Sequence, residues 1–236
     1  MGIRRGPKSI VTENLIYSID IANPDSYVSG STSLNNQIDN QNNGVITNGV
    51  GFDEANGGSL DFDGADDYVE LGSIDSTNPL SLYDQTGFSI DMWLAPEFAG
   101  DDFQRIIEKS TAGSSIGGWG AVLKPSNKTM YFFIDGSTIG NYTDSAANAG
   151  AWRHYTWTRK GNNSIKLYIN GSLVYDVTSA TKSIPSDTAD MRIGSWNHST
   201  GREYNGKIAN IKVYNKELSA EEVSQNYNAL KTRFGL

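Results

Sequence analysis

Apolar and polar residues alternate along most of the chain between residues 59 and 215. In "FSIDMWLAPE" the apolar residues at 88, 90, 92 and 94 share one face, while Ser89, Asp91 and Trp93 share the other. A period of two predicts half-buried β-strands, with the first set facing inward and the second facing outward. Turn residues such as Asn170–Gly171 separate the strands. Short strands at regular spacing predict an all-β fold, a sandwich of two antiparallel sheets.

The chain before residue 59 departs from this regular pattern. "NLIYSIDIA" predicts one half-buried strand with Leu15 and Tyr17 on its inner face. Residues 1–11 are expected to form an extended arm, because Pro7 blocks regular structure. Residues 23–58 are polar, and the stretch "GVITNGVGF" within them predicts a loop and an edge strand wrapped on the domain.

The C-terminal stretch "KELSAEEVSQNYNALKTRFGL" has helical periodicity instead. Ser219 and Glu222 have the spacing of a capping box at the start of a helix. Val223, Tyr227 and Leu230 then form one apolar stripe that can lie on the sandwich. We therefore expect a helix over residues 219–232 and a single domain over residues 12–236.

Composition and charge limit the partners. The formal net charge is −8, which argues against duplex nucleic acid and anionic membranes as partners, because both attract basic surfaces. No apolar run is long enough to insert into a bilayer and no secretory signal is recognisable. We expect a soluble protein made in a cytoplasm. The chain has no cysteine, so no disulfide braces it.

The densest run of acidic residues is "GGSLDFDGADDYVEL". Alternation places Asp61 and Asp63 outward on one strand, with Gly64–Ala65 as the turn to the next. A helix-loop-helix calcium loop needs a different spacing of acids and glycine, so that motif is absent. We expect a solvated hairpin and no cofactor. A calcium site built from loop carboxylates and backbone carbonyls at the sandwich rim is the open alternative.

Four stretches together resemble the laminin-G-like branch of the concanavalin A-like lectin/glucanase superfamily. They are "GGSLDFDGADDYVEL", "FSIDMWLAPE", "AWRHYTWTRKGNNSIKLYINGSLV" and "YNGKIANIKVYNKELSAEEVSQNYNALKTRFGL". The stretches "RRGPKSIVTENLIYSIDIANPDSY" and "ALKTRFGL" are similar to versions found in bacteriophage virion proteins. The resemblance implies a jelly roll that is used to bind sugars or protein surfaces.

The same resemblance argues against catalysis. Laminarinase-like members of the superfamily carry Glu-x-Asp-x-Glu on one strand, and the two outer carboxylates act as nucleophile and acid/base. The equivalent "SIDMW" has Ser89 and Trp93 in their places, so Asp91 stands alone. Many members also carry an acid in the penultimate strand, where this chain has Asn210. We expect no enzyme activity, and the neutral side chain of Asn210 argues against the family's calcium site near that strand.

Four aromatic residues lie at or near turns instead of within apolar stripes, namely Trp119, Tyr142, Trp196 and Tyr204. Sugars stack on exposed aromatic faces, so these four are the predicted carbohydrate-binding residues. The alternative for Trp119 and Trp196 is that they plug the ends of the sandwich. His154 lies in a predicted strand, and we expect it to pack there and not to catalyse.

The favoured hypothesis is a non-enzymatic accessory protein on the exterior of a phage virion, as a capsid decoration or part of a tail appendage. Arg4, Arg5 and Lys8 of the arm would dock it to other virion proteins. The alternative is a glycan-binding module for attachment to the host surface, whose weak sites would gain avidity in a homo-oligomer. A polysaccharide depolymerase is disfavoured by the missing carboxylate pair.

Overall fold

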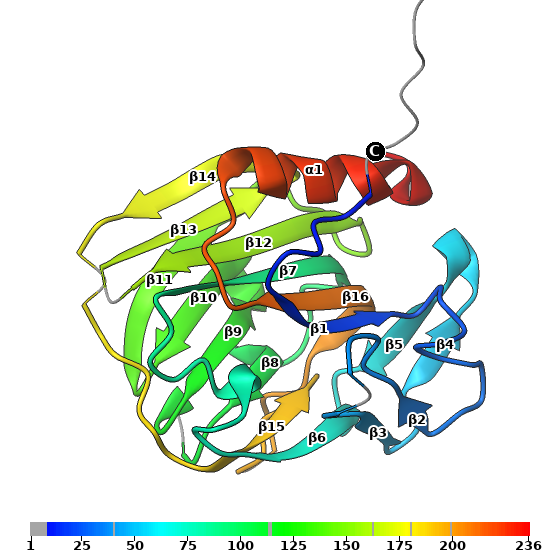
Figure 1. Ribbon diagram of the computed structural model, residues 1–236. Coiled ribbons are helices and arrows are strands. Elements are labelled where there is room, and N and C mark those ends of the chain that lie inside the picture. The colour runs from blue at the N-terminus through cyan, green and yellow to red at the C-terminus, as the bar shows by residue number, and fades with distance from the viewer. Residues whose placement is uncertain (1–8, 40, 113–114, 162, 180, 199) are drawn as a thin grey trace, which may run out of the picture.

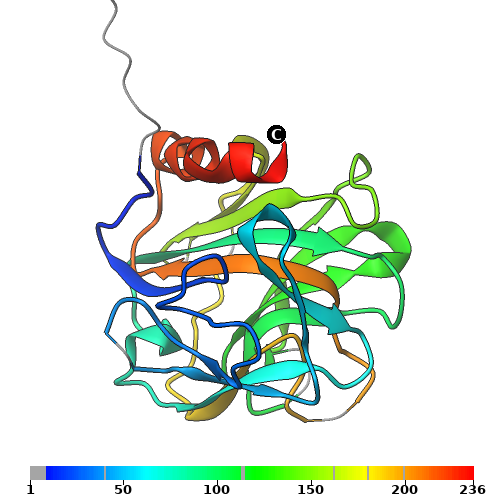
Figure 2. The same ribbon diagram turned by 90° about the vertical axis from the view of Figure 1, so that its right-hand side faces the viewer.

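The computed structural model describes residues 9–39, 41–112, 115–161, 163–179, 181–198 and 200–236. Within these residues the chain folds into two eight-stranded sheets that pack face to face. Helix α1 (Ala220–Leu230) lies across the outer side of one sheet, as Figure 1 and Figure 2 show from two directions. The predicted antiparallel sandwich with one C-terminal helix is confirmed.

Sheet A is the sheet that lies under helix α1. Its strands are β1 (Leu15–Asp20), β4 (Gly51–Asp53), β5 (Ser59–Asp63), β7 (Gly87–Pro96), β12 (Arg153–Lys160), β13 (Ser164–Ile169), β14 (Ser172–Val177) and β16 (Asn205–Tyr214). They run in the order β14-β13-β12-β7-β16-β5-β4, and β1 also pairs with β16. The turn between β13 and β14 is the predicted Asn170–Gly171 hairpin, with φ of 50° and 77° at its two residues.

Sheet B forms the opposite layer. Its strands are β2 (Ser33–Leu34), β3 (Gly44–Thr47), β6 (Tyr68–Ile74), β8 (Gln104–Lys109), β9 (Trp119–Lys124), β10 (Thr129–Ile134), β11 (Ser137–Thr143) and β15 (Ala189–Ile193). They run in the order β11-β10-β9-β8-β15-β6-β3-β2. Residues 23–58 thus supply three short strands at the sheet margins, two more than the single edge strand predicted.

The inner faces of both sheets form one apolar core. The alternating residues Phe88, Ile90, Met92 and Leu94 of β7 are between 0 and 3% exposed, as predicted. They belong to the same cluster as inward residues of β10 such as Phe132. Burial of such side chains provides the main stabilisation, roughly 1.5 to 3 kcal/mol for each large one.

The outer side of sheet A is also buried, which the alternation pattern did not predict. Ser89, Asp91 and Trp93 were expected to face solvent, yet all three are 0% exposed. The reason is the C-terminal segment that crosses this side of the sheet: Trp93 stacks on Phe234 and Tyr227, with ring centres 4.2 and 5.8 Å apart. A strand in this position is therefore covered on both faces.

Helix α1 begins as predicted and joins the N-terminal segment to the sheet. Ser219 and Glu222 form the capping box, with each side chain accepting from the other's backbone N–H. The helix ends at Leu230 and continues as one turn of 3₁₀ helix. Val11 donates its N–H to Oδ1 of Asn226 on this helix at 2.8 Å. Residues 9–11 of the predicted arm therefore lie against the helix.

The acidic stretch is not a hairpin, and that prediction is wrong. β5 pairs with β16 and β4 in sheet A, whereas β6 pairs with β15 and β3 in sheet B. The link between them crosses from one sheet to the other at the rim of the sandwich. Asp67 in this link is 3% exposed, and its Oδ2 accepts a hydrogen bond from the N–H of Asp63 at 3.0 Å.

None of the helices in the described part of the chain is long and apolar enough to cross a bilayer.

Candidate functional site

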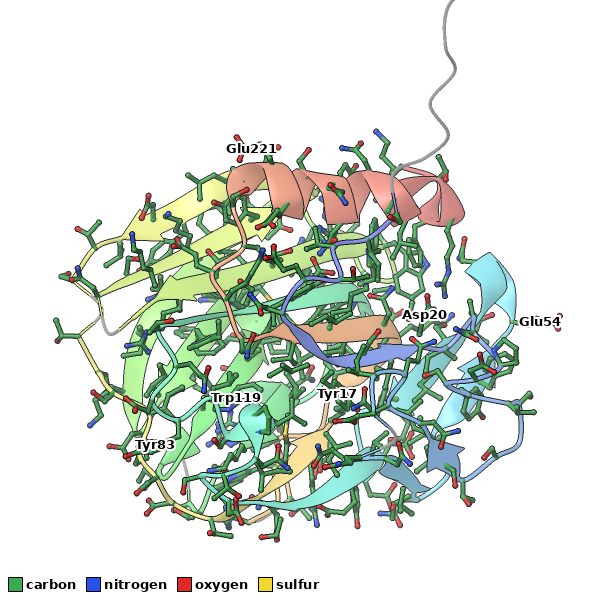
Figure 3. All side chains as sticks on the ribbon, in the orientation of Figure 1. Tyr17, Asp20, Glu54, Tyr83, Trp119 and Glu221 are labelled. Carbon is green, nitrogen blue, oxygen red and sulfur yellow. The ribbon has the colours of Figure 1, made fainter. Side chains whose placement is uncertain are left out.

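Two of the four predicted loop aromatics are buried in the core. Trp119 and Tyr204 are both 0% exposed, so the expectation that they face solvent is wrong. Trp119 stacks on Phe132 with ring centres 6.3 Å apart, and its Nε1–H donates to the Leu80 carbonyl at 3.2 Å. Figure 3 shows Trp119 inside the sandwich. Packing, the alternative reading, holds for this residue.

Tyr142 is half-buried and lies on the core side of β11. It pairs across the strands with Met130, which points inward. Its ring is therefore turned away from the outer side of sheet B, where other aromatic residues gather.

Trp196 is the predicted aromatic residue that lies at the surface beside other rings and charges. It is half-buried in the loop after β15. The guanidinium carbons of Arg105 and Arg202 each lie 5.8 Å from the centre of its ring. The ring of His198 approaches edge-on, with a centre-to-centre distance of 5.6 Å. The cations stabilise the ring electrostatically and hold it in a defined orientation.

Three further aromatic residues continue from Trp196 over the outer side of sheet B. Phe103 lies just before β8, and its ring centre is 5.5 Å from Tyr131 and 6.3 Å from Phe133, both on β10. The guanidinium carbon of Arg202 lies 5.4 Å from the centre of Phe103 as well as beside Trp196. We call Phe103, Tyr131, Phe133 and Trp196 the aromatic face.

The sequence contained a signal for part of this surface. In "TMYFFID" the inward residues Met130, Phe132 and Ile134 force Tyr131 and Phe133 onto the opposite side of the strand. Strand pairing then aligns Tyr131 with Val122 on β9, and Val122 with Arg105 on β8. The alternation thus predicts that Tyr131 and Phe133 of β10 face outward, but it does not predict the position of Phe103.

Charged side chains surround the aromatic face. Arg105 and Glu108 form a buried ion pair, and Glu108 also accepts from the hydroxyl of Ser115 at 2.8 Å. Burial lowers the pKa of Arg105 even though the carboxylate of Glu108 opposes that shift. At the other margin the ammonium of Lys124 lies 5.3 Å from the centre of Phe103. The face is therefore aromatic in its middle, and its edges carry Arg105 and Lys124, which pair with Glu108 and Asp102.

A pocket of about 300 Å³ opens beside Trp196. Tyr68 and Arg192 form one side of it, and the guanidinium carbon of Arg192 lies 4.1 Å above the ring of Tyr68. Nε of Arg192 is also 2.6 Å from Oε2 of Glu70, which fixes the guanidinium. Asn197 and His198 contribute polar groups to the lining. The pocket offers hydrogen-bonding groups next to a flat aromatic surface, a combination that suits a sugar ring.

The acidic link between β5 and β6 borders the same pocket. Asp63, Asp66 and Asp67 offer carboxylate oxygens that lie within 4.8 Å of one another, and they are the one group of this kind among the residues that the structure describes. Burial raises the pKa of Asp67, and the neighbouring carboxylates add to that effect. Calcium prefers six to eight oxygen ligands, so this group would supply part of a calcium shell at the rim. Asn210 does not belong to this group of possible calcium ligands. Its Oδ1 accepts a hydrogen bond from the ammonium of Lys212 at 2.9 Å inside the fold.

Asp91, the candidate for catalysis by a depolymerase, is sealed beneath helix α1. Its Oδ2 lies 2.8 Å from Nε2 of His154 and accepts from the hydroxyl of Thr156 at 3.0 Å. Its Oδ1 lies 3.5 Å from the ammonium of Lys212. Burial alone would raise the pKa of Asp91, but these positive charges and hydrogen bonds outweigh it and hold the pKa well below its usual range. The arrangement stabilises an anion that substrate cannot reach. His154 packs within the fold, as predicted.

The predicted docking residues of the arm cannot be placed. Arg4, Arg5 and Lys8 lie outside the described residues, and their role stays a prediction.

Comparison with protein families agrees with this fold. Residues 62–224 match the family described as the concanavalin A-like lectin/glucanases superfamily. The chain belongs to this superfamily. No curated protein matches this concanavalin A-like chain.

Solved structures with the same fold include two kinds of domain. Domain 4 of AbnA, an extracellular GH43 arabinanase from Geobacillus stearothermophilus solved with arabinotriose, is 16% identical with a TM-score of 0.65, covering 91% of this chain and 98% of that domain. The binding domain of botulinum neurotoxin serotype D/C is 18% identical with a TM-score of 0.67, covering 92% of this chain. The binding domain of botulinum neurotoxin DC in complex with SialylT is 16% identical with a TM-score of 0.66, again covering 92%. This concanavalin A-like chain spans about half of each neurotoxin binding domain, 52% in both cases.

Proposed function

We propose that this chain is a glycan-binding module that holds an oligosaccharide along the aromatic face. The observation that carries the proposal is the position of Arg202 between Trp196 and Phe103, 5.8 and 5.4 Å from the two ring centres. A guanidinium that lies within cation–π distance of two rings favours one orientation of both before any ligand arrives. Such preorganisation lowers the entropy cost of binding.

The aromatic face suits a chain of sugars better than a single ring. Trp196, Phe103 and Tyr131 follow one another across the surface, so successive sugar units can each meet an aromatic ring. The pocket beside Trp196 would hold one end of the chain through Asn197 and Arg192. The margin formed by Lys124 and Arg202 would donate hydrogen bonds to hydroxyl oxygens and attract any acidic substituents.

Two solved structures with the same fold support a binding function for this chain. The arabinanase domain was solved with arabinotriose and the neurotoxin binding domain with SialylT. Both likenesses are at the level of fold, so they favour a binding role without identifying the ligand. The burial of Asp91 among His154, Thr156 and Lys212 supports a non-enzymatic module.

The virion setting rests on the resemblance of the sequence to phage proteins and stays a prediction. A module that decorates a particle can also bind glycans, so the two hypotheses are compatible. Docking of the arm to other virion proteins, and attachment to a host surface, are expectations of the same kind.

A glycan array followed by calorimetry tests the proposal. We expect the wild-type chain to bind an oligosaccharide, and arabino-oligosaccharides are a natural first probe. Trp196→Ala and Tyr131→Ala should each weaken binding about three- to tenfold, the value of one aromatic contact. Leu173→Ala is the matched control, because Leu173 is 50% exposed on β14 of the other sheet. Binding that neither aromatic substitution alters would contradict the proposal.

A further inference from the structure

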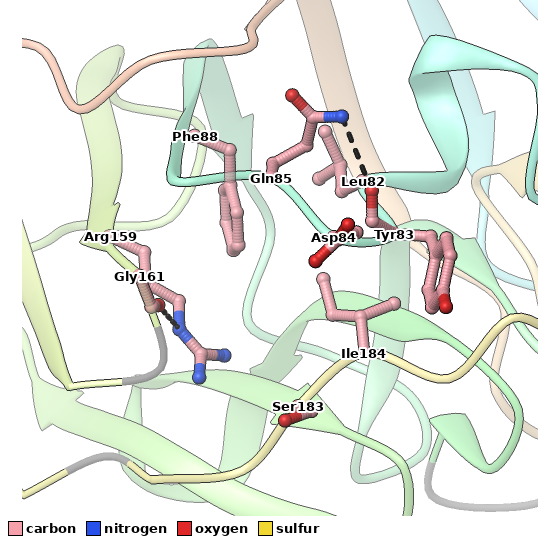
Figure 4. A pocket seen from close by; sticks show the side chains of 9 residues that line it. All are labelled: Leu82, Tyr83, Asp84, Gln85, Phe88, Arg159, Gly161, Ser183 and Ile184. Carbon is pink, nitrogen blue, oxygen red and sulfur yellow. Dashed lines mark hydrogen bonds between the residues drawn. The ribbon is translucent and has the colours of Figure 1, made fainter.

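A second pocket lies at the opposite end of the sandwich. Its volume is about 310 Å³, and Figure 4 shows the residues that line it. It opens where β7 begins, beside Phe88, whereas Pro96 at the other end of β7 pairs with Gly206 near the acidic link. It therefore shares no residue with the pocket beside Trp196.

One wall of this pocket is apolar. Leu82, Phe88 and Ile184 form it and are 2, 3 and 7% exposed. Tyr83 stands at the rim with 39% of its surface exposed. Its place at the edge of the molecule is visible in Figure 3. An apolar wall with an aromatic ring at the mouth can take up the non-polar face of a sugar ring.

The facing wall carries a positive charge. Arg159 is 1% exposed, and its guanidinium donates from Nε to the Gly161 carbonyl at 2.8 Å and from Nη2 to the Lys182 carbonyl. Burial lowers the pKa of Arg159 to about 10, so the group remains charged at neutral pH. A cation in such a weakly solvated wall attracts anions more strongly than one in water.

The backbone that forms the rim is held in an unusual conformation. Leu82 and Asp84 both have φ of 54°, in the left-handed region that residues with a side chain rarely adopt. These two residues flank Tyr83 at the rim of the pocket. Backbone strain of this kind collects at binding sites, where it positions side chains. It places Tyr83 and the carboxylate of Asp84 around the mouth of the pocket, across from Arg159 (Figure 4).

We propose that this pocket binds one sugar ring that carries a carboxylate, such as a uronic or sialic acid residue. The carboxylate would face Arg159, and the non-polar side of the ring would lie on Phe88 and Ile184. Tyr83 would cover the outer edge, the carboxylate of Asp84 would accept hydrogen bonds from hydroxyl groups, and the hydroxyl of Ser183 could donate or accept them. The volume, at the low end for ligand pockets, suits a single ring and not a longer chain.

The test is an NMR titration of the full chain with matched sugars. Methyl glucuronide and methyl glucoside differ only by the carboxylate, and the methyl glycoside of N-acetylneuraminic acid provides the second acidic probe. We expect saturable shifts at residues 82–88 and 183–184 with one or both acidic probes, and far weaker shifts with the glucoside. Affinity should fall as salt is added, because the attraction to Arg159 is electrostatic.

Two substitutions and one control complete the test. Tyr83→Ala removes an exposed ring and should weaken binding of the acidic sugar about three- to tenfold. Arg159→Lys keeps the charge but loses the planar fork, and should weaken it about tenfold or more. Leu173→Ala, at a residue that is 50% exposed on β14 and lines neither pocket, is the control and should leave it unchanged. Equal binding of glucuronide and glucoside, no saturable shift with either acid, or an unchanged affinity in Tyr83→Ala would overturn the proposal.

Discussion

Nε2 of His154 lies 2.8 Å from Oδ2 of Asp91, and both side chains are wholly buried under helix α1. This contact sits at the centre of a polar cluster that joins four elements, strands β7, β12 and β16 and helix α1. Thr156 extends it along β12, Lys212 connects it to β16, and Asn226 connects it to the helix. The cluster fixes the C-terminal segment on sheet A through directional contacts that an apolar interface would lack.

We expect Asp91→Ala to destabilise the fold severely. The substitution leaves the ammonium of Lys212, 2% exposed, without its carboxylate, and breaking one partner of a buried pair costs about 3 to 5 kcal/mol. Urea unfolding followed by tryptophan fluorescence measures this loss. Asp176→Ala, on exposed β14, is the matched control and should change the free energy of unfolding by less than about 0.5 kcal/mol. Similar stability in the two variants would contradict the role given to the cluster.

The same carboxylate predicts a pH dependence of stability. The pKa of Asp91 is lower in the folded chain than in the unfolded chain, where it is about 3.9. Its contribution is therefore complete above that value and is lost as the pH falls from there toward the folded pKa. Unfolding free energies measured between about pH 6 and pH 2 should fall more steeply for the wild type than for Asp91→Asn. Parallel curves would show that other acids dominate.

Asn226 is predicted to hold the N-terminal segment. Its Oδ1 accepts from Val11 at 2.8 Å, and its Nδ2 donates to the Tyr214 hydroxyl at 3.0 Å. Asn226→Ala leaves buried polar groups without partners, at a cost of about 1 to 3 kcal/mol. Hydrogen exchange should show faster exchange of the Val11 amide. Asn228→Ala on the exposed side of the same helix should show no such effect, and equal protection in both variants would refute the assignment.

Gly194 is predicted to set the position of the Trp196 loop. It has φ of 89°, and a Cβ atom there would lie 2.3 Å from Cε1 of Phe62 in the core. Gly72 has a similar φ of 78° but open space around it, so Gly72→Ala isolates the backbone cost of roughly 1 to 2 kcal/mol. Gly194→Ala should cost about 1 to 3 kcal/mol more, because Phe62 must move. It should also weaken glycan binding. Thermal unfolding measures the difference, and equal melting temperatures would contradict it.

Alternation was a sound guide to the inside of the sandwich and a poor guide to its outside. It identified Ile90 and Met92 as core residues because the period of two is a property of the strand itself. It misplaced Asp91 and Trp93, because whether an outer face meets water depends on a helix more than a hundred residues later. That contact is tertiary, and no local pattern records it.

The candidate site shows the same limit. Trp196 was recognised because its loop carries no apolar stripe, but Trp119 had the same local signature and packs in the core. The sequence predicted a hairpin for the acidic link because a strand, a glycine turn and a second strand occur both in hairpins and in links that cross between two sheets. Only the pairing partners of β5 and β6 reveal the crossing between sheets. Phe103 belongs to the site because its ring contacts β10, and its neighbours in the sequence do not indicate these contacts.

The course of helix α1 has a consequence for how the module would be presented. Ser9 accepts a hydrogen bond from Gln225 at 2.8 Å, so the first described residues and the last helix share one side of the molecule (Figure 1). Sheet A and then sheet B separate that side from the aromatic rings. The contact between Ser9 and Gln225 therefore lies on the side of the domain opposite Trp196 and its neighbours.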